Sequence, residues 1–360
     1  MPKTIAIGLS GGVDSTLTAL LLKEQGYHVI GLSMSIYNKD IPEMKLAGKS
    51  CYGPTEKQDI RDIQIWAQNQ GIDSHIIDLS EPFKKSVLQH FRDTYLAGQT
   101  PNPCIMCNAW MKFGLLIDTA RAQGISFDAF ATGHYARIEQ RNNRFILRKG
   151  RDEIKDQSYF LYRVSQDKLA QTLFPLGDYT KEDVRQMARD RGLLVADKAD
   201  SQDFYGGDYT DLLQQEARRG DITLPNGTIL GHHTGFWNYT VGQRKGLGIA
   251  YPKPLFVLAL DAQNNRVIVG PASETKQESC TVDNLVWGGL CDDITIGITE
   301  STFVTVKYRS TGRPVPAVLE PSEDKTIRVV FNEPQRSLTP GQSIVFYQND
   351  AVLGGGIIRP

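Results

Sequence analysis

The string "GLSGGVDS" at residues 8–15 constrains the fold of this chain most, because it joins two different apolar patterns. The preceding "TIAIGLS" (4–10) is typical of a buried strand, and the following "STLTALLLKEQGY" (15–27) has the spacing of an amphipathic helix. A glycine-rich turn from a strand into a helix is where open α/β sheets bind phosphate groups. We therefore expect a parallel βαβ unit with a nucleotide-binding loop at its first turn.

The same alternation of strand and helix continues through about the first 200 residues. Further strands are predicted at 28–37, 73–80 and 127–138, and further helices at 55–72, 84–98 and 180–193. From about residue 205, helical periodicity gives way to short β-branched segments separated by turn signals. This pattern predicts an α/β protein of three parts: an N-terminal Rossmann-like domain with a parallel sheet (1–205), a small β-rich central domain (206–273) and a C-terminal antiparallel β-barrel (274–360).

The composition is that of a globular protein with a sizeable core, since 40% of the 360 residues are hydrophobic and 22% are charged. No apolar run approaches the ~20 residues that cross a bilayer, and the N-terminus lacks the pattern of a secretory signal. Five cysteines, an odd number, agree with a compartment that keeps thiols reduced. We expect a cytoplasmic protein that does not contact membranes.

The loop at 8–15 has the chemistry of a phosphate site. Its small residues, Ser10, Gly11 and Gly12, let backbone amides approach phosphate oxygens closely. Ser15 offers a hydroxyl donor, and Asp14 is a candidate ligand for a Mg²⁺ ion that bridges phosphates. The string matches neither the Walker loop nor the dinucleotide fingerprint. It resembles the PP-motif of ATP pyrophosphatases, which implies cleavage of ATP to AMP and pyrophosphate and adenylation of a substrate oxygen.

A second chemical feature is the pair Cys104 and Cys107 in "TPNPCIMCNAWMKFG" (100–114). The pair alone allows a zinc site, a redox pair, two thiols buried as small apolar groups, or a nucleophilic thiolate. A four-ligand zinc site is poorly supported, because the other cysteines (51, 280 and 291) are scattered singly. A thiolate is favoured, since an adenylated substrate needs a soft nucleophile and the start of the following helix would lower a cysteine pKa.

Motifs along nearly the whole chain resemble those of the tRNA-uridine 2-sulfurtransferase (tRNA-specific 2-thiouridylase) family. They are "GLSGGVDS", "TPNPCIMCN", "ATGHYAR", "KDQSYFLYR", "FPLGDYTKEDVR", "YTVGQRKGLGI" and "PGQSIVFY". The resemblance implies ATP-dependent adenylation of the C2 oxygen of the wobble uridine of tRNA, then replacement of that oxygen by sulfur. It also implies ATP and Mg²⁺ as cofactors, and the anticodon arm of tRNA and a sulfur-donor protein or sulfide as partners of a monomer.

The resemblance also assigns roles to single positions. It places ATP contacts at Gly8, Leu9, Ser10, Gly11, Gly12, Val13, Asp14, Ser15, Met34 and Gly133. It makes Cys107 the nucleophile and places contacts to the target base at Asn102, Pro103 and Cys104. It places tRNA contacts at His134, Lys155, Asp156, Gln157, Lys307, Tyr308 and Gln342. The basic stretch 137–155, by itself either a solvated hairpin face or an RNA surface, then becomes an RNA surface beside a barrel that grips the anticodon arm.

The chain departs from the family where many members carry a second catalytic cysteine in a motif like S-x-x-I-C-F. The corresponding stretch is "DSQDFYGGDY" (200–209), and Tyr205 stands at the cysteine position. Two replacements stay open. In one, Cys104 is the persulfide partner of Cys107; in the other, Cys51, Cys104 and Cys107 hold a [4Fe-4S] cluster. We favour the cluster, because it accounts for one cysteine lost and two gained. The remaining cysteines, Cys280 and Cys291, are interpreted as structural.

Two other functions are kept as alternatives. One is a PP-loop ATP pyrophosphatase of another type, which amidates its substrate or modifies tRNA without sulfur. Such an enzyme has no need of a cysteine pair beside "TPNP". The other is a non-catalytic, ATP-responsive RNA-binding protein, which disagrees with the presence of Asp14, Ser15 and Cys107.

Overall fold

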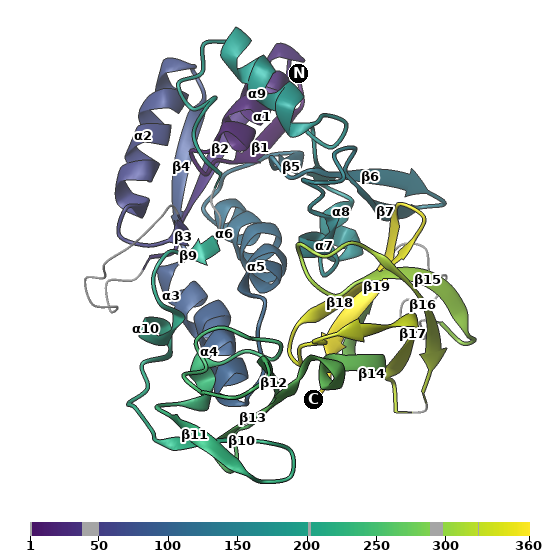
Figure 1. The fold of residues 1–360 in the computed structure, drawn as a ribbon. Coiled ribbons are helices and arrows are strands. Elements are labelled where there is room, and N and C mark those ends of the chain that lie inside the picture. Colours follow the sequence, from purple (N-terminus) through teal and green to yellow (C-terminus); the bar gives the residue numbers. More distant parts are fainter. Residues whose placement is uncertain (1, 38–49, 201–202, 289–297, 323) are drawn as a thin grey trace.

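The N-terminal domain is built on a five-stranded parallel sheet. The computed structural model describes residues 2–37, 50–200, 203–288, 298–322 and 324–360 (Figure 1). In spatial order the sheet contains β4 (Asp73–Asp78), β2 (His28–Ser35), β1 (Thr4–Gly8), β5 (Ala129–Ala131) and β8 (Thr172–Leu173). The register pairs Ile5 of β1 with Val29 of β2 on one side and with Ala129 of β5 on the other. This arrangement confirms the predicted Rossmann-like α/β domain.

Helices cover both faces of this sheet because side chains alternate along its buried central strand. Ile5 and Ile7 of β1 share a core with α1 (Val13–Glu24) and α2 (Glu56–Asn69). Ala6, between them, belongs to a second core that includes Leu116 and Ile117 of α6 (Leu116–Ala122). The helix α9 (Lys181–Asp190) packs against α1.

The predicted cysteine helix is a continuous helical run from Pro103 to Ala122. It contains α5 (Pro103–Met106), a π-helical stretch η2 (Cys107–Leu115) and then α6. The helix predicted at 84–98 likewise belongs to a longer run, formed by α3 (Ser80–Phe83), π-helical η1 (Lys84–Leu88) and α4 (Gln89–Leu96). Stretches of π-helix are rare and frequently mark functional sites. The one that begins at Cys107 agrees with a chemical role for this segment.

The central part is a small mixed sheet. In spatial order it contains β11 (Ile229–His233), β10 (Gly220–Thr223), β13 (Arg266–Pro271) and β12 (Leu255–Asp261). Strands β12 and β13 form an antiparallel hairpin, whereas β10 and β13 are parallel. Before this sheet lie the helix α10 (Tyr209–Leu213) and a separate two-stranded ladder of β3 (Ser50–Tyr52) with β9 (Asp203–Tyr205).

The C-terminal part is a closed antiparallel barrel, as predicted. Its strands are β14 (Lys276–Trp287), β15 (Thr302–Lys307), β16 (Val315–Pro321), β17 (Ile327–Arg336), β18 (Ser343–Gln348) and β19 (Ala351–Ile358). The long strand β14 pairs with both β17 and β19, and this double pairing closes the six strands on themselves. Closure leaves these strands without unpaired edges. Residues such as Val306, Val329 and Phe346 fill the interior and are fully buried.

The basic stretch 137–155 begins as a hairpin that joins the N-terminal domain to the barrel. Strand β7 (Arg144–Lys149) pairs with β6 (Ala136–Arg141) and, through Arg148 opposite Ala351, with β19. Arg137 and Arg148 both form ion pairs with Asp350 beside this junction. Part of the basic charge of the stretch is therefore used to hold the hairpin in place.

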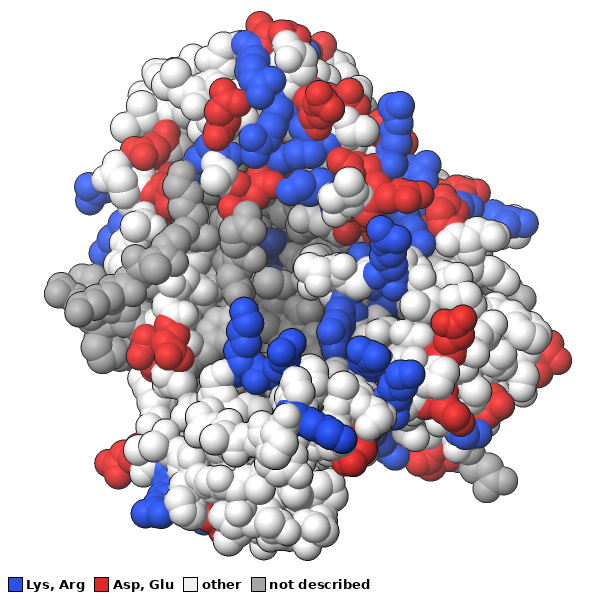
Figure 2. Space-filling view, viewed as in Figure 1, with Lys and Arg blue, Asp and Glu red and all other residues white. Residues whose placement is uncertain are grey.

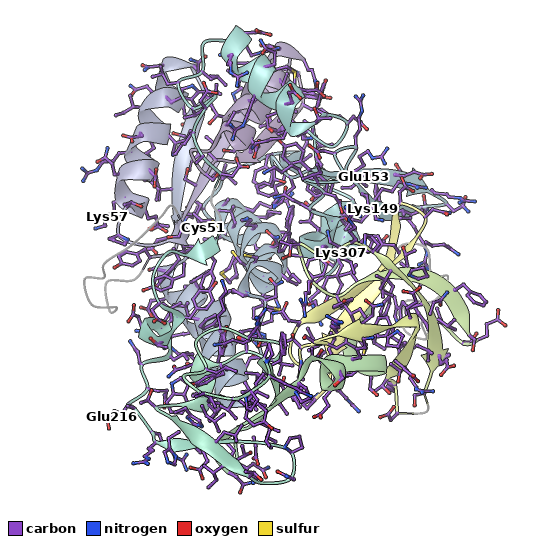
Figure 3. The ribbon with its side chains drawn as sticks, viewed as in Figure 1. Cys51, Lys57, Lys149, Glu153, Glu216 and Lys307 are labelled. Atoms are coloured by element: carbon purple, nitrogen blue, oxygen red, sulfur yellow. The ribbon has the colours of Figure 1, made fainter. Side chains whose placement is uncertain are left out.

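Lysine and arginine side chains gather around the hollow on one face of the molecule, between the N-terminal domain and the barrel (Figure 2). Lys149 and Lys307 lie on the barrel side of this region (Figure 3). Within the described residues, no helix is both long enough and apolar enough to cross a bilayer.

Candidate active site

The phosphate loop lies between the last residue of β1, Gly8, and the first residue of α1, Val13. Gly11 has a φ of +72°, a left-handed conformation that glycine adopts without strain. The Ser15 hydroxyl accepts a hydrogen bond from the Ser10 amide at 3.2 Å and donates to the Gly12 carbonyl at 3.2 Å, which curls the loop over the helix start. Its backbone thus lies at a helix N-terminus, which is a favourable place for an anion.

The other residues predicted to bind ATP lie at the same edge of the sheet. Met34 is near the carboxyl end of β2, and Gly133 follows β5 by two residues. A Cβ atom at Gly133 would lie 2.7 Å from the Asp14 carbonyl carbon and 2.9 Å from the Ser15 nitrogen. Any side chain at 133 would therefore push the phosphate loop out of place. The structure brings these segments together, and their contacts with ATP stay a prediction.

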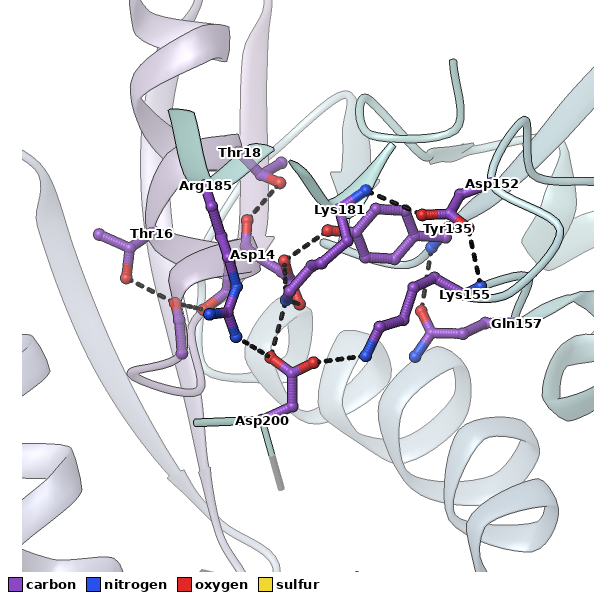
Figure 4. A network of polar contacts seen from close by, with 12 residues as sticks. Asp14, Thr16, Thr18, Tyr135, Asp152, Lys155, Gln157, Lys181, Arg185 and Asp200 are labelled. Carbon is purple, nitrogen blue, oxygen red and sulfur yellow. Dashed lines mark hydrogen bonds and ion pairs between the residues drawn. The ribbon is translucent and has the colours of Figure 1, made fainter. Parts of the chain in front are cut away.

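The Asp14 carboxylate is the centre of a partly buried charge network (Figure 4). Both of its oxygens lie 2.8 Å from the Lys181 ammonium, and one of them accepts a hydrogen bond from the Tyr135 hydroxyl at 2.7 Å. Lys181 also contacts Asp200 at 2.8 Å, and the second Asp200 oxygen lies 2.8 Å from Lys155. Burial alone would raise the Asp200 pKa, but the hydrogen bonds from both lysines hold that pKa below its usual value.

This network bears on the Mg²⁺ ion that the sequence implies. Asp14 supplies a carboxylate, the kind of hard oxygen ligand that Mg²⁺ takes together with water and phosphate oxygens. The residue type therefore fits the ion. In the described conformation, however, both Asp14 oxygens accept hydrogen bonds from Lys181, so this lysine competes with a metal for the carboxylate.

The two cysteines of the 103–122 run are partly buried. Cys104 lies in α5 and Cys107 begins η2, and both pack against the main apolar core. The Asn102 side chain caps this run by accepting a hydrogen bond from the Ile105 amide at 3.3 Å. Burial raises the pKa of Cys107 to about 11, the Lys112 charge lowers it, and the nearby Cys51 raises it further. The expected lowering by the helix start is thus wrong for Cys107, because desolvation outweighs it.

Aromatic packing connects the cysteine helix to the phosphate loop. Phe113 of η2 lies 5.8 Å from Phe130 of β5 and 5.9 Å from His134, between ring centroids. His134 follows Gly133 directly, and its ring nitrogen bonds the Thr132 hydroxyl at 2.7 Å. Burial holds the His134 pKa well below its usual value, so the imidazole is neutral at physiological pH.

Several residues predicted to contact tRNA have partners within the protein. Buried Asp156 accepts hydrogen bonds from the Gly150 and Ser158 amides at 3.1 Å each. Gln157 accepts one from the Tyr135 amide at 2.9 Å. These acceptors position the segment that carries Lys155, and a direct contact with tRNA stays a prediction.

The barrel residues predicted to contact tRNA also have interaction partners within the protein. Lys307 is buried, with its ammonium 5.9 Å from the centre of the Tyr159 ring. The Tyr308 hydroxyl donates to Gln335 at 3.0 Å. The Gln342 amide donates to the carbonyl oxygens of residues 100 and 101, at 3.1 and 2.9 Å. Gln342 therefore ties the barrel to the loop that precedes the cysteine helix, a role that the sequence alone did not indicate.

Comparison with known proteins identifies the family to which the chain belongs. Family models match the chain in succession: "tRNA methyl transferase HUP domain" at 3–205, "tRNA methyl transferase PRC-barrel domain" at 210–271 and "Aminomethyltransferase beta-barrel domain" at 277–358. A tRNA-specific 2-thiouridylase MnmA of Endomicrobium trichonymphae is 46% identical and covers 98% of both chains. Relatives of the same description from Acetivibrio thermocellus and Trichormus variabilis are each 42% identical, over 99% of both chains. The chain belongs to the tRNA-specific 2-thiouridylase family.

The resemblance to the 2-thiouridylase family places Tyr205 at the position where many members carry a cysteine, and this correspondence stays a prediction. Tyr205 is buried in β9, whose parallel partner is β3, and lies directly opposite Tyr52. The neighbouring residue of β3 is Cys51, which is exposed to solvent. An accessible thiol therefore lies one strand away from the position where many 2-thiouridylases carry a cysteine.

The predicted iron–sulfur cluster finds no support in this geometry. Among the residues that the structure describes, no three His, Cys, Asp or Glu side chains converge as a metal site. In this conformation Cys51, Cys104 and Cys107 do not form a ligand set. Cys280, in β14, is partly buried in the barrel core; Cys291 lies outside the described residues.

Asp14 and Lys155 of the charge network were predicted as site residues, but Lys181, Asp200 and Tyr135 were not. Lys181 opens α9, although a cation at a helix N-terminus opposes the helix dipole. That conflict between residue type and position is the one signal that could have pointed to it. Asp200 and Tyr135 carry no comparable signal, since single acidic or aromatic residues are common at such positions.

Proposed function

We propose that the protein is an ATP-dependent tRNA-uridine 2-sulfurtransferase. It adenylates the C2 oxygen of the wobble uridine of tRNA and replaces that oxygen with sulfur, releasing AMP. Membership of the 2-thiouridylase family supports this function. The structural observation that carries it is the packing of the Cys107 helix, through Phe113, on the β5 end whose Gly133 touches the phosphate loop.

The residues divide the reaction into two tasks. Backbone amides of residues 8–15 bind the phosphates of ATP, so that the uridine oxygen displaces pyrophosphate and becomes part of a good leaving group, AMP. Cys107 then carries the transferable sulfur, which forms a bond to C2 while the bond from C2 to the AMP oxygen breaks and AMP leaves. With a pKa of about 11, Cys107 is a neutral thiol in the resting protein, and the nearby Lys112 is the cation that favours its ionised form.

Sulfur delivery is proposed along one of two routes. In the first, which uses the Cys104 and Cys107 pair on one helical run, a persulfide on a sulfur-donor protein transfers its outer sulfur to Cys107. The Cys107 persulfide then attacks C2 and AMP leaves. The Cys104 thiolate attacks the Cys107 sulfur and releases 2-thiouridine, and the resulting disulfide is reopened by an external thiol reductant.

In the second route, Cys51 joins Cys104 and Cys107 in holding a [4Fe-4S] cluster. Iron and labile sulfide in anaerobically purified protein, lost in Cys51→Ser, would support the second route. A fully active Cys51→Ser protein without iron would exclude it and favour the first.

The partners follow from the same function. The anticodon arm of tRNA binds the barrel side of the hollow, where Lys149 and Lys307 lie, together with the basic hairpin 136–149. A sulfur-donor protein or sulfide supplies the sulfur. We propose that the protein works as a monomer in the cytoplasm, where its thiols stay reduced.

The decisive experiment incubates the full chain with tRNA, ATP, Mg²⁺, a persulfide-carrying sulfur-donor protein and a thiol reductant, then digests the tRNA and detects 2-thiouridine by mass. We expect thiolation at the wobble position with release of AMP. Cys107→Ser should abolish the product, whereas Cys280→Ser, a cysteine in the barrel wall, should not. AMP release without thiolated product would instead favour another ATP pyrophosphatase activity, and absence of both would favour a non-catalytic RNA-binding protein.

A further inference from the structure

Lys181 is a buried lysine that the roles described so far do not use. Its side chain is 10% exposed, and its three nearest acceptors are the two Asp14 oxygens and one Asp200 oxygen, each at 2.8 Å. An ammonium group has three hydrogen-bond donors, so the group is fully satisfied. The lysine reaches Asp14 across 167 residues of sequence, and Asp14 belongs to the phosphate loop.

Helix stability does not explain this lysine. The start of α9 is already satisfied by a capping box, in which Thr180 and Asp183 each accept a hydrogen bond from the other's amide, at 3.1 and 2.9 Å. A cation as the first helical residue works against the helix dipole. The Lys181 amide donates to Asp152 at 2.9 Å, which fixes the residue in place while its side chain extends toward the loop.

Three cations gather beside the phosphate loop. Lys155 lies 2.8 Å and Arg185 3.9 Å from Asp200, which Lys181 also contacts. The carboxylates of Asp14, Asp200 and Asp152 balance them, and the cluster lies beside a loop whose backbone is arranged for phosphate. Without nucleotide, the Asp14 and Asp200 carboxylates occupy the positions around the ammonium that phosphate oxygens would take.

We propose that Lys181 is a phosphate-binding residue of the adenylation site. In the nucleotide-free protein Asp14 and Asp200 hold it; when ATP binds, it turns to the β- and γ-phosphates and frees Asp14 for Mg²⁺. In the adenylation step the uridine oxygen forms a bond to the α-phosphorus, the bond from that phosphorus to the bridging oxygen breaks, and pyrophosphate leaves with the electron pair. Lys181 keeps its protons and stabilises the charge of the leaving pyrophosphate. The inference rests on the proposed use of ATP.

The competing explanation is that Lys181 forms a purely structural ion pair. The two explanations predict different effects of a Lys181 substitution on the affinities for ATP, pyrophosphate and AMP. AMP lacks the β- and γ-phosphates, so a residue that binds those groups contributes to the affinity for ATP and pyrophosphate but not for AMP. A structural pair would alter the thermal midpoint and would affect the three ligands alike. Ligand binding is therefore measured directly, without tRNA and without turnover.

The experiment titrates ATP, AMP and pyrophosphate, each with Mg²⁺, into the full-length protein by calorimetry. For Lys181→Met we expect ATP and pyrophosphate affinities to fall about 10- to 100-fold, as for loss of a charged hydrogen bond, with AMP affinity within about twofold. Lys181→Arg should recover part of the loss. The matched control is Lys168→Met, which breaks the 2.6 Å ion pair of Lys168 with Asp118, outside the network, and should bind ATP like the unmodified protein.

A second variant keeps the test decisive if Lys181→Met does not fold. Asp200→Asn removes one of the carboxylates that compete with phosphate for Lys181, so ATP affinity should rise about two- to fivefold while AMP affinity does not. If the affinities for ATP and AMP change equally in both variants, or do not change, Lys181 does not bind the β- and γ-phosphates. That result would leave the proposed function standing. Failure of the unmodified protein to bind ATP would overturn the proposed function together with this inference.

Discussion

Burial, more than neighbouring charge, sets the protonation of the two residues closest to the proposed chemistry. The Cys107 pKa rises to about 11 and the His134 pKa falls well below its usual value, and desolvation is the largest cause of both shifts. The resting protein therefore holds a neutral thiol and a neutral imidazole beside the aromatic cluster of Phe113. A neutral thiol is a weak nucleophile, so we expect Cys107 to react only when substrate binding favours its thiolate.

The first prediction concerns the reactivity of Cys107. At pH 7.5, iodoacetamide should alkylate the exposed Cys51 much faster than Cys107, because a thiol with a pKa of about 11 is thiolate in only on the order of one molecule in a few thousand. Peptide mass spectrometry over time measures both rates. The Cys107 rate should keep rising up to pH 10, and alkylation of Cys107 ahead of Cys51 at pH 7.5 would contradict this account.

The second prediction follows from His134. Its folded-state pKa lies below the unfolded value of 6.5, so only the unfolded chain takes up this proton as the pH falls through 6.5. Stability should therefore be fully present above about pH 7 and decrease below pH 6.5, by at most about 1.4 kcal/mol per pH unit for this group. Urea unfolding at pH 7.5 and 5.5 measures the loss.

A His134→Gln variant should lose less stability between these two pH values than the unmodified chain. The matched control is His28→Gln, since His28 is exposed at the start of β2. An identical loss in His134→Gln and the unmodified chain would show that other groups dominate the acid dependence.

At the scale of elements, the site depends on how strand ends and helix starts meet. The phosphate loop, the Gly133 turn and the start of α9 come from the connections that follow three separate strands, β1, β5 and β8. The start of α9 is fixed locally by the Thr180 capping box. Parallel strands end at one edge of the sheet, so these connections necessarily converge there.

The third prediction tests the close approach of two of these connections. Gly133→Ala places a Cβ 2.7 Å from the Asp14 main chain, so the loop must shift and ATP affinity should fall at least about tenfold, as expected when several charged hydrogen bonds weaken. Calorimetry with ATP measures the change. In the control, Gly231→Ala, the new Cβ meets only Ile249 at 3.7 Å, an ordinary contact, and ATP affinity should not change. Unchanged ATP binding in Gly133→Ala would refute the loop assignment.

At the scale of the whole molecule, the barrel is attached to the catalytic part at two places. Strand β7 adds to the barrel sheet beside β19, and the loop around Gln342 docks on the residues before the cysteine helix. The second contact is tight, because a Cβ at Gly341 would meet the Thr100 nitrogen at 2.8 Å. The barrel is thus in direct contact with the loop that leads to Cys104 and Cys107.

The fourth prediction addresses this coupling. Gln342→Ala removes two hydrogen bonds to the loop carbonyls and should lower kcat of thiolation about three- to tenfold, since each such bond contributes about 1 kcal/mol to holding the loop. ATP affinity should stay the same, because the phosphate loop is not touched. The control is Gln348→Ala, an exposed residue at the end of β18. Equal thiolation rates in Gln342→Ala and the unmodified protein would show that the docking does not position the cysteines.

Much of the architecture could be predicted, because it follows from patterns of residues that lie close together in the sequence. Alternating strands and helices indicated the parallel sheet, and short β-branched runs indicated the barrel. The helix predicted at 84–98 begins earlier, at Ser80, since the π-helical turn η1 lets the run continue without a break. The burial that raises the Cys107 pKa was not predictable, because it depends on packing against core residues from distant parts of the sequence.

The sequence by itself determined the phosphate loop, the cysteine pair and the order of the three parts, since each depends on residues close together in the chain. Only the tertiary structure decided that Lys181 pairs with Asp14, that Cys51 lies on the strand beside Tyr205, and that a hairpin of the first domain extends the barrel sheet. These contacts join segments far apart in the chain, and they form only where packing of the sheet, helices and barrel brings the segments together. Local propensity carries no information about such pairings, which is why the charge network at the phosphate loop became visible only in the fold.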